Sequence, residues 1–207
     1  MRILSQEFYA RPARLVAPDL LGKRLVRNYD GQRIAGLIVE TEAYCDAEEP
    51  DLACHGDRTN KGRPTPRTKV MFGPAGFGYV YFTYGMHWMF NVVTGKTGQA
   101  NAVLIRALEP VEGEWLIARN RAGRERADWT NGPAKLAQAL AIDGTLNEVC
   151  LFKTEGGIWI EDQPTISFEN ISTGPRVGLG NTPEPWISKP WRYWLTNNRF
   201  VSGKNRG

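Results

Sequence analysis

The spacing of apolar residues predicts a short helix and then a β-hairpin near the start of the chain. Residues 13–21 carry their apolar side chains at roughly helical intervals, although Pro18 shortens or breaks such a helix. Two runs rich in β-forming residues follow, Lys23–Asn28 and Arg33–Thr41. Because Asp30-Gly31 between them is typical of tight turns, the two runs are predicted to pair as a hairpin.

A loop of 25 residues, Cys45–Lys69, is predicted after this hairpin. Structureless loops of this length are uncommon in compact domains and often carry function. The loop also divides by charge into an acidic first part and a basic second part. The acidic side chains are Asp46, Glu48, Glu49 and Asp51, and the basic ones are Arg58, Lys61, Arg63, Arg67 and Lys69.

The middle of the chain predicts a second hairpin and one more strand. Aromatic and β-branched residues fill Phe77–Thr94, which divides into two strands around a turn near Tyr84–His87. Asn101–Leu108 predicts a further strand that ends at Glu109-Pro110. This region therefore adds three strands to the hairpin predicted before it.

Two helices and a set of Gly- and Pro-rich strands are predicted for the rest of the chain. The helices fall at Glu112–Ala122 and Gly132–Ile142, the second with Asn131 as its cap and Pro133 in its first turn. The sequence contains no internal repeat, low-complexity tract or Gly/Ser linker. The pattern therefore predicts a single α+β domain that covers residues 1–207.

Composition narrows the class of protein. Hydrophobic residues make up 42% of the 207 positions and charged residues 23%, which excludes a disordered chain, a collagen and a coiled coil. No apolar run approaches the ~18 residues of a membrane-spanning helix, and the first residues lack the apolar core of a secretory signal. Three cysteines give no disulfide framework. We expect a protein that is not secreted: cytoplasmic, at the nucleoid, in a bacterium, or nuclear in a eukaryote.

Positive charge is modest overall but concentrates at the C-terminus. The net charge is +4, which permits nucleic-acid binding without requiring it. Five basic and five aromatic side chains, with no acidic one, lie between Pro185 and Gly207. They are Lys189, Arg192, Arg199, Lys204 and Arg206, with Trp186, Trp191, Tyr193, Trp194 and Phe200.

Several kinds of site are excluded by their missing motifs. The chain has two histidines, and the spacing of Cys45, Cys54 and His55 matches no zinc finger or ribbon, so we expect no metal site. No phosphate-binding G-x-x-x-x-G-K-[ST] loop and no G-x-S-x-G nucleophile elbow occurs. The candidate chemistry is therefore left to carboxylates.

Glu40 and Glu42 are the candidate carboxylates, because strand alternation places both on one face. They are either an exposed pair on a solvated strand edge or a general base held beside an arginine. Arg106 lies inside an apolar strand and needs a carboxylate partner there. Glu42 or Glu40 is an available partner, and Glu109 is the competing one.

The second predicted hairpin carries Tyr84-Gly85-Met86 where turns usually have Asn, Asp or Ser. Such an aromatic either packs on the core or forms an apolar wedge of the kind that opens a base step in DNA. Tyr79 and Tyr81 fall on one face of the preceding strand, where their rings could stack on a base.

Eight short motifs occur in one order across nearly the whole chain, and together they closely resemble the alkyladenine (methylpurine) DNA glycosylase family. Any single one of them is weak, but their collinear order is specific. They are I-V-E-T-E-A-Y (38–44), P-T-P-R (64–67), Y-V-Y (79–81), Y-G-M-H (84–87), N-V-V (91–93), V-L-I-R-A-L-E-P (103–110), G-P-A-K-L (132–136) and P-R-V-G (175–178).

The resemblance implies a mixed domain with a curved antiparallel sheet, flanking helices and a protruding β-hairpin. It implies an enzyme that flips alkylated or deaminated purines out of double-stranded DNA and hydrolyses the N-glycosidic bond, leaving an abasic site. Neither a metal nor an organic cofactor is implied, and we expect a monomer without a membrane partner. The alternatives are a non-catalytic nucleic-acid-binding module with the same surface and a small-molecule glycosidase.

The resemblance also implies roles for individual residues. Glu42 matches the catalytic base, Arg106 helps to hold the attacking water, and the backbone carbonyl of Val177 is that water's third contact. Tyr44, His55, Tyr81, Asn91 and Leu104 match the pocket for the flipped base. Tyr84 and Met86 match the DNA-intercalating tip, and Arg63, Thr65, Arg67 and Lys135 match phosphate contacts.

The chain departs from the family pattern in two places. Trp88 and Met89 are bulkier than expected beside the hairpin motif. Asp57–Lys61 is an apparent insertion between His55 and the P-T-P-R motif, and it supplies basic residues suited to phosphate contacts.

Overall fold

An antiparallel sheet forms the centre of the protein, seen in a computed structural model that describes residues 2–45, 50–58 and 63–203. The strands are β1 (Arg24–Tyr29), β2 (Gln32–Tyr44), β3 (Gly78–Thr83), β4 (His87–Val93), β5 (Ala102–Glu112), β6 (Ile158–Glu161), β7 (Ile171–Gly174) and β8 (Arg192–Leu195). Six of them lie in the order β3-β4-β5-β2-β1-β6, while β8 pairs with both β2 and β7.

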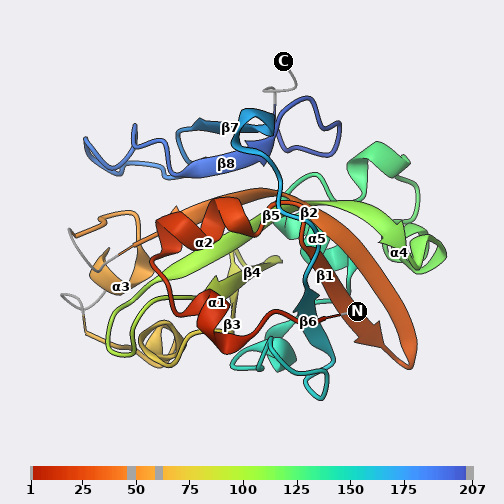
Figure 1. Ribbon diagram of the computed structural model, residues 1–207, viewed down its shortest axis with the longest axis horizontal. Coiled ribbons are helices and arrows are strands. Elements are labelled where there is room, and N and C mark those ends of the chain that lie inside the picture. Colours follow the sequence, from red (N-terminus) through yellow and green to blue (C-terminus); the bar gives the residue numbers. More distant parts are fainter. Residues whose placement is uncertain (1, 46–49, 59–62, 204–207) are drawn as a thin grey trace.

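Short helices surround this sheet (Figure 1). They are α1 (Gln6–Tyr9), α2 (Ala13–Asp19), α3 (His55–Arg58), α4 (Glu114–Asn120) and α5 (Pro133–Ala139), with 3-10 turns η2 (Lys69–Phe72), η3 (Arg126–Asp128), η4 (Gly144–Leu146) and η5 (Phe168–Asn170). Helix α2 lies against β2, where the Thr41 hydroxyl donates to the Ala17 carbonyl at 2.9 Å, and α5 packs on β4 and β5. The single mixed α+β architecture predicted from the sequence is confirmed.

Strand β2 organises the sheet because it has different partners along its length. One edge pairs with β5 from Ala35 to Tyr44, while the other pairs first with β1 and then, at residues 40–42, with β8. The ladder with β5 shifts register between Ile38 and Glu40 and again between Glu40 and Thr41. Such irregularities bend a strand and redirect its side chains. The sheet therefore curves at Glu40, where three strands meet.

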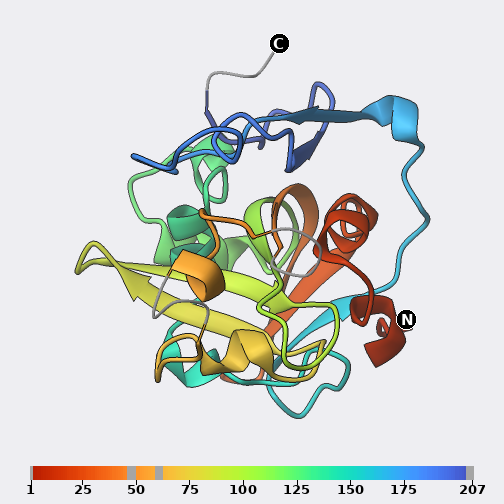
Figure 2. The same ribbon diagram turned by 90° about the vertical axis from the view of Figure 1, so that its left-hand side faces the viewer.

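The β3–β4 hairpin projects from the body of the protein (Figure 2, yellow). Thr83 pairs with His87, which leaves Tyr84, Gly85 and Met86 as the turn. Tyr84 has a φ of +52° and Gly85 a φ of +66°. The left-handed region is uncommon for a residue other than glycine, asparagine or aspartate, so Tyr84 occupies a strained position.

The structure corrects two boundaries and adds two helices. Strand β5 does not end at Glu109-Pro110 but runs to Glu112, with Pro110 paired to Gly36. A side chain at Gly36 would come within 2.9 Å of Leu108, so glycine allows the close approach that carries the strand past the proline. Asn131 is not the cap of α5: Gly132 takes that position, and the Asn131 amide binds Asp128 and Lys135. Helices α1 and α3 were not predicted.

Some of the residues named in the sequence predictions lie outside the part of the chain that the structure describes. Residues 46–49, with three of the acidic side chains of the long loop, Thr59–Lys61 of the insertion, and Lys204 and Arg206 are not among those described. Within the described part of the chain, no helix has both the length and the apolar character needed to cross a membrane.

Candidate active site

A cavity of about 350 Å³ lies between the base of the hairpin, the start of β5 and residues 177–182. Tyr44, His55, Tyr81, Asn91 and Leu104, the five side chains predicted to hold a base, all line it. Arg106, Val177 and Tyr84 line it as well. The structure thus brings these eight predicted residues to one place, although they come from five separate segments; Met86, the other predicted intercalating residue, does not line the cavity.

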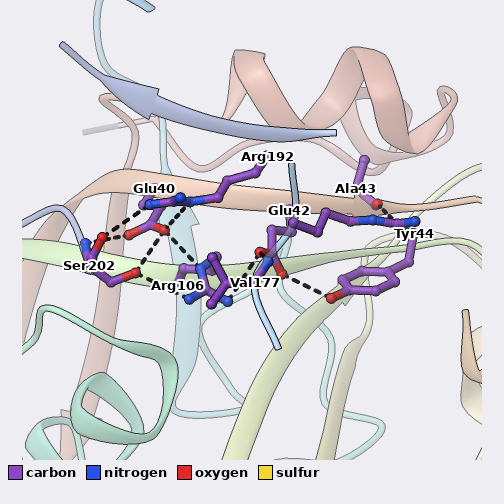
Figure 3. A network of polar contacts seen from close by, with 9 residues as sticks. Glu40, Glu42, Ala43, Tyr44, Arg106, Val177, Arg192 and Ser202 are labelled. Atoms are coloured by element: carbon purple, nitrogen blue, oxygen red, sulfur yellow. Dashed lines mark hydrogen bonds and ion pairs between the residues drawn. The ribbon is translucent and has the colours of Figure 1, made fainter. Parts of the chain in front are cut away.

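Glu42 is buried, at 0% exposure, directly behind the residues that line the cavity (Figure 3). Its Oε1 accepts a 2.6 Å hydrogen bond from the Val177 N–H and lies 3.2 Å from Nη1 of Arg106. Its Oε2 accepts a 2.9 Å bond from the Tyr44 hydroxyl. These three contacts hold the Glu42 carboxylate in one orientation beside the cavity.

The exposed-pair alternative for the two glutamates is wrong, because Glu40 is also at 0% exposure. Arg106 joins both, donating from Nε to Glu40 at 2.8 Å while Nη1 approaches Glu42. Glu109 is not its partner and instead accepts a bond from Asn198. Burial lowers the pKa of the Arg106 guanidinium, but Glu42 and Glu40 raise it more, so its pKa lies above the ordinary value.

Val177 reaches Glu42 through its backbone N–H, whereas the resemblance assigned a role to its carbonyl. The contact depends on the preceding residue. Arg176 forms two hydrogen bonds to Asp51, of 2.6 and 2.9 Å, in a pair with no exposed side-chain surface, and also donates to the Ala43 carbonyl at 3.0 Å. This ion pair fixes the Val177 segment against the end of β2.

Sequence reasoning missed the Arg176–Asp51 pair. Arg176 was visible in the P-R-V-G motif and Asp51 as one acid of the long loop, but their separation of 125 residues gives no local signal. Burial lowers the pKa of Arg176, and the bonds to Asp51 outweigh this and raise it. The guanidinium also lies 4.8 Å over the Tyr44 ring, so it holds that ring as well.

The aromatic side chains that line the cavity contact one another and Glu42. Burial, with the neighbouring Glu42 charge, raises the pKa of Tyr44 well above its ordinary value, so its hydroxyl keeps the proton that it donates to Glu42. Burial raises the pKa of Tyr81 to about 12. The His55 ring lies edge-on to Tyr81 with centroids 4.8 Å apart, and its Nδ1 is 2.9 Å from the Tyr79 hydroxyl.

Tyr79 and Tyr81 do share one strand face, with ring centroids 5.1 Å apart. Tyr79 is only 1% exposed, so Tyr81 offers more ring surface to a ligand. The Asn91 amide donates to the Tyr79 carbonyl at 3.0 Å, which fixes its orientation in the wall. Together these contacts hold the side chains that give the cavity its aromatic faces.

The tip of the hairpin is exposed, which makes the core-packing alternative for Tyr84 wrong. Tyr84 is 79% exposed and Met86 66%. An exposed aromatic ring at a left-handed position serves neither packing nor turn geometry. Backbone strain of this kind concentrates at functional sites, where another requirement selects the residue.

The predicted phosphate contacts lie in different environments. Arg63 and Arg67 are exposed, and the Arg67 guanidinium lies 4.9 Å over the Tyr81 ring at the cavity. The Thr65 hydroxyl is 3.0 Å from that of Thr68 and organises the turn. Lys135 donates to Asn131 at 2.7 Å and lies 3.4 Å from Asp128, so part of its charge is compensated.

The basic C-terminal stretch is not a uniform surface patch. Arg192 is 3% exposed and donates from Nε to Glu40 at 2.7 Å. Lys189 lies over the Trp191 ring and Arg199 over the Phe200 ring.

No group of His, Cys, Asp and Glu side chains within the described residues could hold a metal ion.

Known proteins that are similar to this chain belong to the family that its motifs resemble. Residues 7–199 match the family model described as "Methylpurine-DNA glycosylase (MPG)". A protein of Carboxydothermus hydrogenoformans is 47% identical over 203 residues, which are 98% of this chain and 100% of the relative. One of Bacillus subtilis is 44% identical over 195 residues, 94% of each chain, and one of Methanocella arvoryzae is 42% identical over 210 residues, 100% of this chain and 99% of the relative.

Each of these three relatives carries the name "Putative 3-methyladenine DNA glycosylase". The family match covers most of the chain, and the relatives align with it almost from end to end. The chain therefore belongs to the methylpurine-DNA glycosylase family, as its motifs predicted.

Proposed function

We propose that this protein removes alkylated or deaminated purines from double-stranded DNA by hydrolysing the N-glycosidic bond, with Glu42 as the base that activates water. One observation carries the proposal. Glu42 is fully buried, yet all three groups that contact its carboxylate, from Tyr44, Val177 and Arg106, line an aromatic cavity. A damaged base held in that cavity would have its sugar close to the carboxylate.

The chemical step needs one water and one acceptor of its proton. A carboxylate offers about four acceptor positions, and the contacts from the three groups above account for three. Because Glu42 has no exposed surface in this structure, one of these contacts would have to shift for a water to reach the fourth position. The water oxygen attacks C1′ of the deoxyribose as Glu42 takes a proton from it, and the electron pair of the C1′–N bond leaves with the base. Until that proton is transferred, the negative charge of the Glu42 carboxylate stabilises the positive charge that develops on the sugar in the oxocarbenium-like transition state.

The charge of the damaged base decides whether it must be protonated before it leaves. Purines alkylated at N3 or N7 are cationic and leave as neutral molecules, so the electron pair needs no added proton. Deaminated purines are neutral and need protonation. The aromatic faces of Tyr44 and Tyr81 and the edge of His55 suit a flat, cationic base, because a cation is attracted to aromatic rings. Asn91 and Leu104 would complete the cavity.

Reaching the base requires that it leave the stack. Extrusion costs a few kcal/mol and is easiest for a damaged base, which contributes to selectivity. The exposed ring of Tyr84, next to Met86, would fill the gap left in the duplex. Arg63, Arg67, Lys135 and the turn at Thr65 would hold phosphates, and a monomer without cofactor suffices for this chemistry.

The reaction is proposed to stop at the abasic site. A lyase step needs an amine nucleophile, and the Lys135 amine is bonded to Asn131 and lies near Asp128. The proposal for Lys135 is therefore a phosphate contact.

Glu42→Gln tests the proposal. The purified protein is incubated with duplexes that carry 3-methyladenine, 7-methylguanine, hypoxanthine or ethenoadenine, and alkali then cleaves at abasic sites. Loss of a positioned general base should lower base release by ~10²-fold or more while lesion-DNA binding is kept. The non-catalytic alternative predicts no base release by the wild-type protein and no effect of Glu42 on binding.

A further inference from the structure

A second buried carboxylate lies directly behind the proposed catalytic pair. Glu40 accepts bonds at Oε1 from Nε of Arg106 at 2.8 Å, Nε of Arg192 at 2.7 Å and the Ser202 hydroxyl at 2.8 Å. Its Oε2 accepts the Ser202 N–H at 2.6 Å. Figure 3 shows these groups converging on Glu40, on the side of Arg106 away from Tyr44.

This arrangement uses all three nitrogens of the Arg106 guanidinium. Nε binds Glu40, Nη2 donates to the Ser202 hydroxyl at 3.1 Å, and Nη1 faces Glu42 at 3.2 Å. Because a guanidinium is planar, two fixed nitrogens determine the direction of the third. Glu40 and Ser202 therefore set the point at which Arg106 meets Glu42.

The charges of the cluster also balance. Glu40 and Glu42 carry two negative charges, and Arg106 and Arg192 carry two positive ones, all at most 5% exposed. Removing one member of a buried ionic cluster leaves an uncompensated charge. Glu40 contacts Arg106 at 2.8 Å, closer than Glu42 at 3.2 Å, so it fixes the direction of the guanidinium as well as contributing to its neutralisation.

The C-terminal segment supplies the rest of this support. Arg192 comes from β8, which pairs with β2 at residues 40–42, and its Nη2 donates to the Ser202 carbonyl at 3.0 Å. Phe200 and Val201, each 1% exposed, pack with Val39 and Ala107 on β2 and β5. The segment at residues 200–202 is thus anchored against the strands that carry the two glutamates.

We propose that Glu40, Arg192 and Ser202 form a positioning unit that holds Arg106 in the orientation needed for water activation at Glu42. This inference rests on the proposed function, in which Glu42 activates the water and Arg106 contacts its carboxylate. None of the three need touch DNA. Their effect would appear in the chemical step and not in binding, because a displacement of about 1 Å in such a site can cost up to ~10²-fold in rate.

The test compares Glu40→Gln with Glu161→Gln. Glu161 is a matched control, since it is also buried, binds Arg33 through two bonds of 3.0 and 2.8 Å, and lies on β6 at the far edge of the sheet. Thermal melting, affinity for lesion duplex and the single-turnover rate of base release are measured for both, with Ser202→Ala as a milder variant.

Glu40→Gln should lower the single-turnover rate about tenfold with lesion affinity unchanged, and Ser202→Ala should lower it a few-fold. Glu161→Gln should also destabilise the protein, because it breaks a pair with Arg33, but should keep the rate per folded molecule. Equal rate losses in Glu40→Gln and Glu161→Gln, or an unchanged rate in Glu40→Gln, would overturn the positioning role.

A second readout does not depend on activity. In wild-type protein the Nε–H of Arg106, bonded to Glu40, should exchange slowly with solvent in nitrogen-15 NMR spectra, and Glu40→Gln should accelerate that exchange. If the wild-type protein releases no base, the proposed function fails, yet this measurement still decides the positioning role: unchanged exchange of Arg106 in Glu40→Gln refutes it.

Discussion

Replacing Tyr84 with asparagine should separate the function of the hairpin tip from its contribution to folding. The ring is 79% exposed, so about a fifth of its surface touches protein. An aromatic side chain that is fully buried hides ~150–250 Å², so Tyr84 buries about 40 Å², worth about 1 kcal/mol at ~25 cal/mol per Å². Against this loss, asparagine relieves part of the ~1–2 kcal/mol cost of a left-handed conformation. The two effects nearly cancel.

The expected change in the free energy of unfolding is therefore within about 1 kcal/mol of zero. For a chain of this size the melting temperature should shift by no more than about 4 °C in either direction. A ring packed in the core would instead cost about 3–5 kcal/mol on truncation. Thermal melting of Tyr84→Asn distinguishes the two.

Excision from duplex DNA should respond very differently. A ring that stacks in the gap of the flipped state contributes ~1–3 kcal/mol, and each ~1.4 kcal/mol is a factor of ten. Tyr84→Asn should lower excision from paired duplex by about 10–100-fold, whereas Tyr84→Phe, which keeps the ring, should retain most activity. Single-stranded DNA with the same lesion has no gap to fill and serves as the internal control. An equal loss on single-stranded and paired substrates, or a large drop in melting temperature with activity per folded molecule retained, would refute the wedge.

Two further predictions concern charge. Binding to undamaged duplex should weaken steeply as the salt concentration rises. Arg63→Ala or Arg67→Ala should each reduce the slope of log affinity against log salt concentration by about one. An affinity that stays constant between low and physiological salt would argue for a small-molecule enzyme. Burial raises the pKa of Tyr81 to about 12, above the ~10 of an unfolded tyrosine, so the native state keeps a proton that the unfolded state releases. That contribution to stability is complete below about pH 10 and is lost between about pH 10 and 12. Urea titrations from pH 9 to 11.5 should therefore show a shallower decline for Tyr81→Phe than for wild type, and identical slopes would contradict the assignment.

Local patterns in the sequence were sufficient for most elements. Asp30-Gly31 predicted the first hairpin, and the aromatic runs around Gly85 predicted the second, because turn and strand preferences act over a few residues. The end of β5 was predicted wrongly, since Pro110 normally stops a strand and only the partner glycine, Gly36, lets it continue. The cap of α5 was also predicted wrongly, because the Asn131 side chain forms hydrogen bonds with Asp128 and Lys135 instead.

The candidate site was predictable as a set of residues but not as an arrangement. Motif order predicted the family, which the comparisons confirm, and it named the positions that meet at the cavity. It could not show that Arg106 binds both glutamates, nor that Arg192 is buried. The C-terminal run of basic residues looked like one surface, and only the pairing of β8 with β2 places Arg192 against Glu40.

The sequence by itself determined most of the elements, the single mixed domain, the family and the residues that could carry chemistry, because each of these depends on local preference or on order along the chain. The tertiary structure alone decided which charges meet. Glu40 is joined to Arg192 across 152 residues, and Arg176 to Asp51 across 125. No periodicity encodes such pairs. They form because a buried charge is stable only beside its counter-charge, and the fold determines where that partner lies.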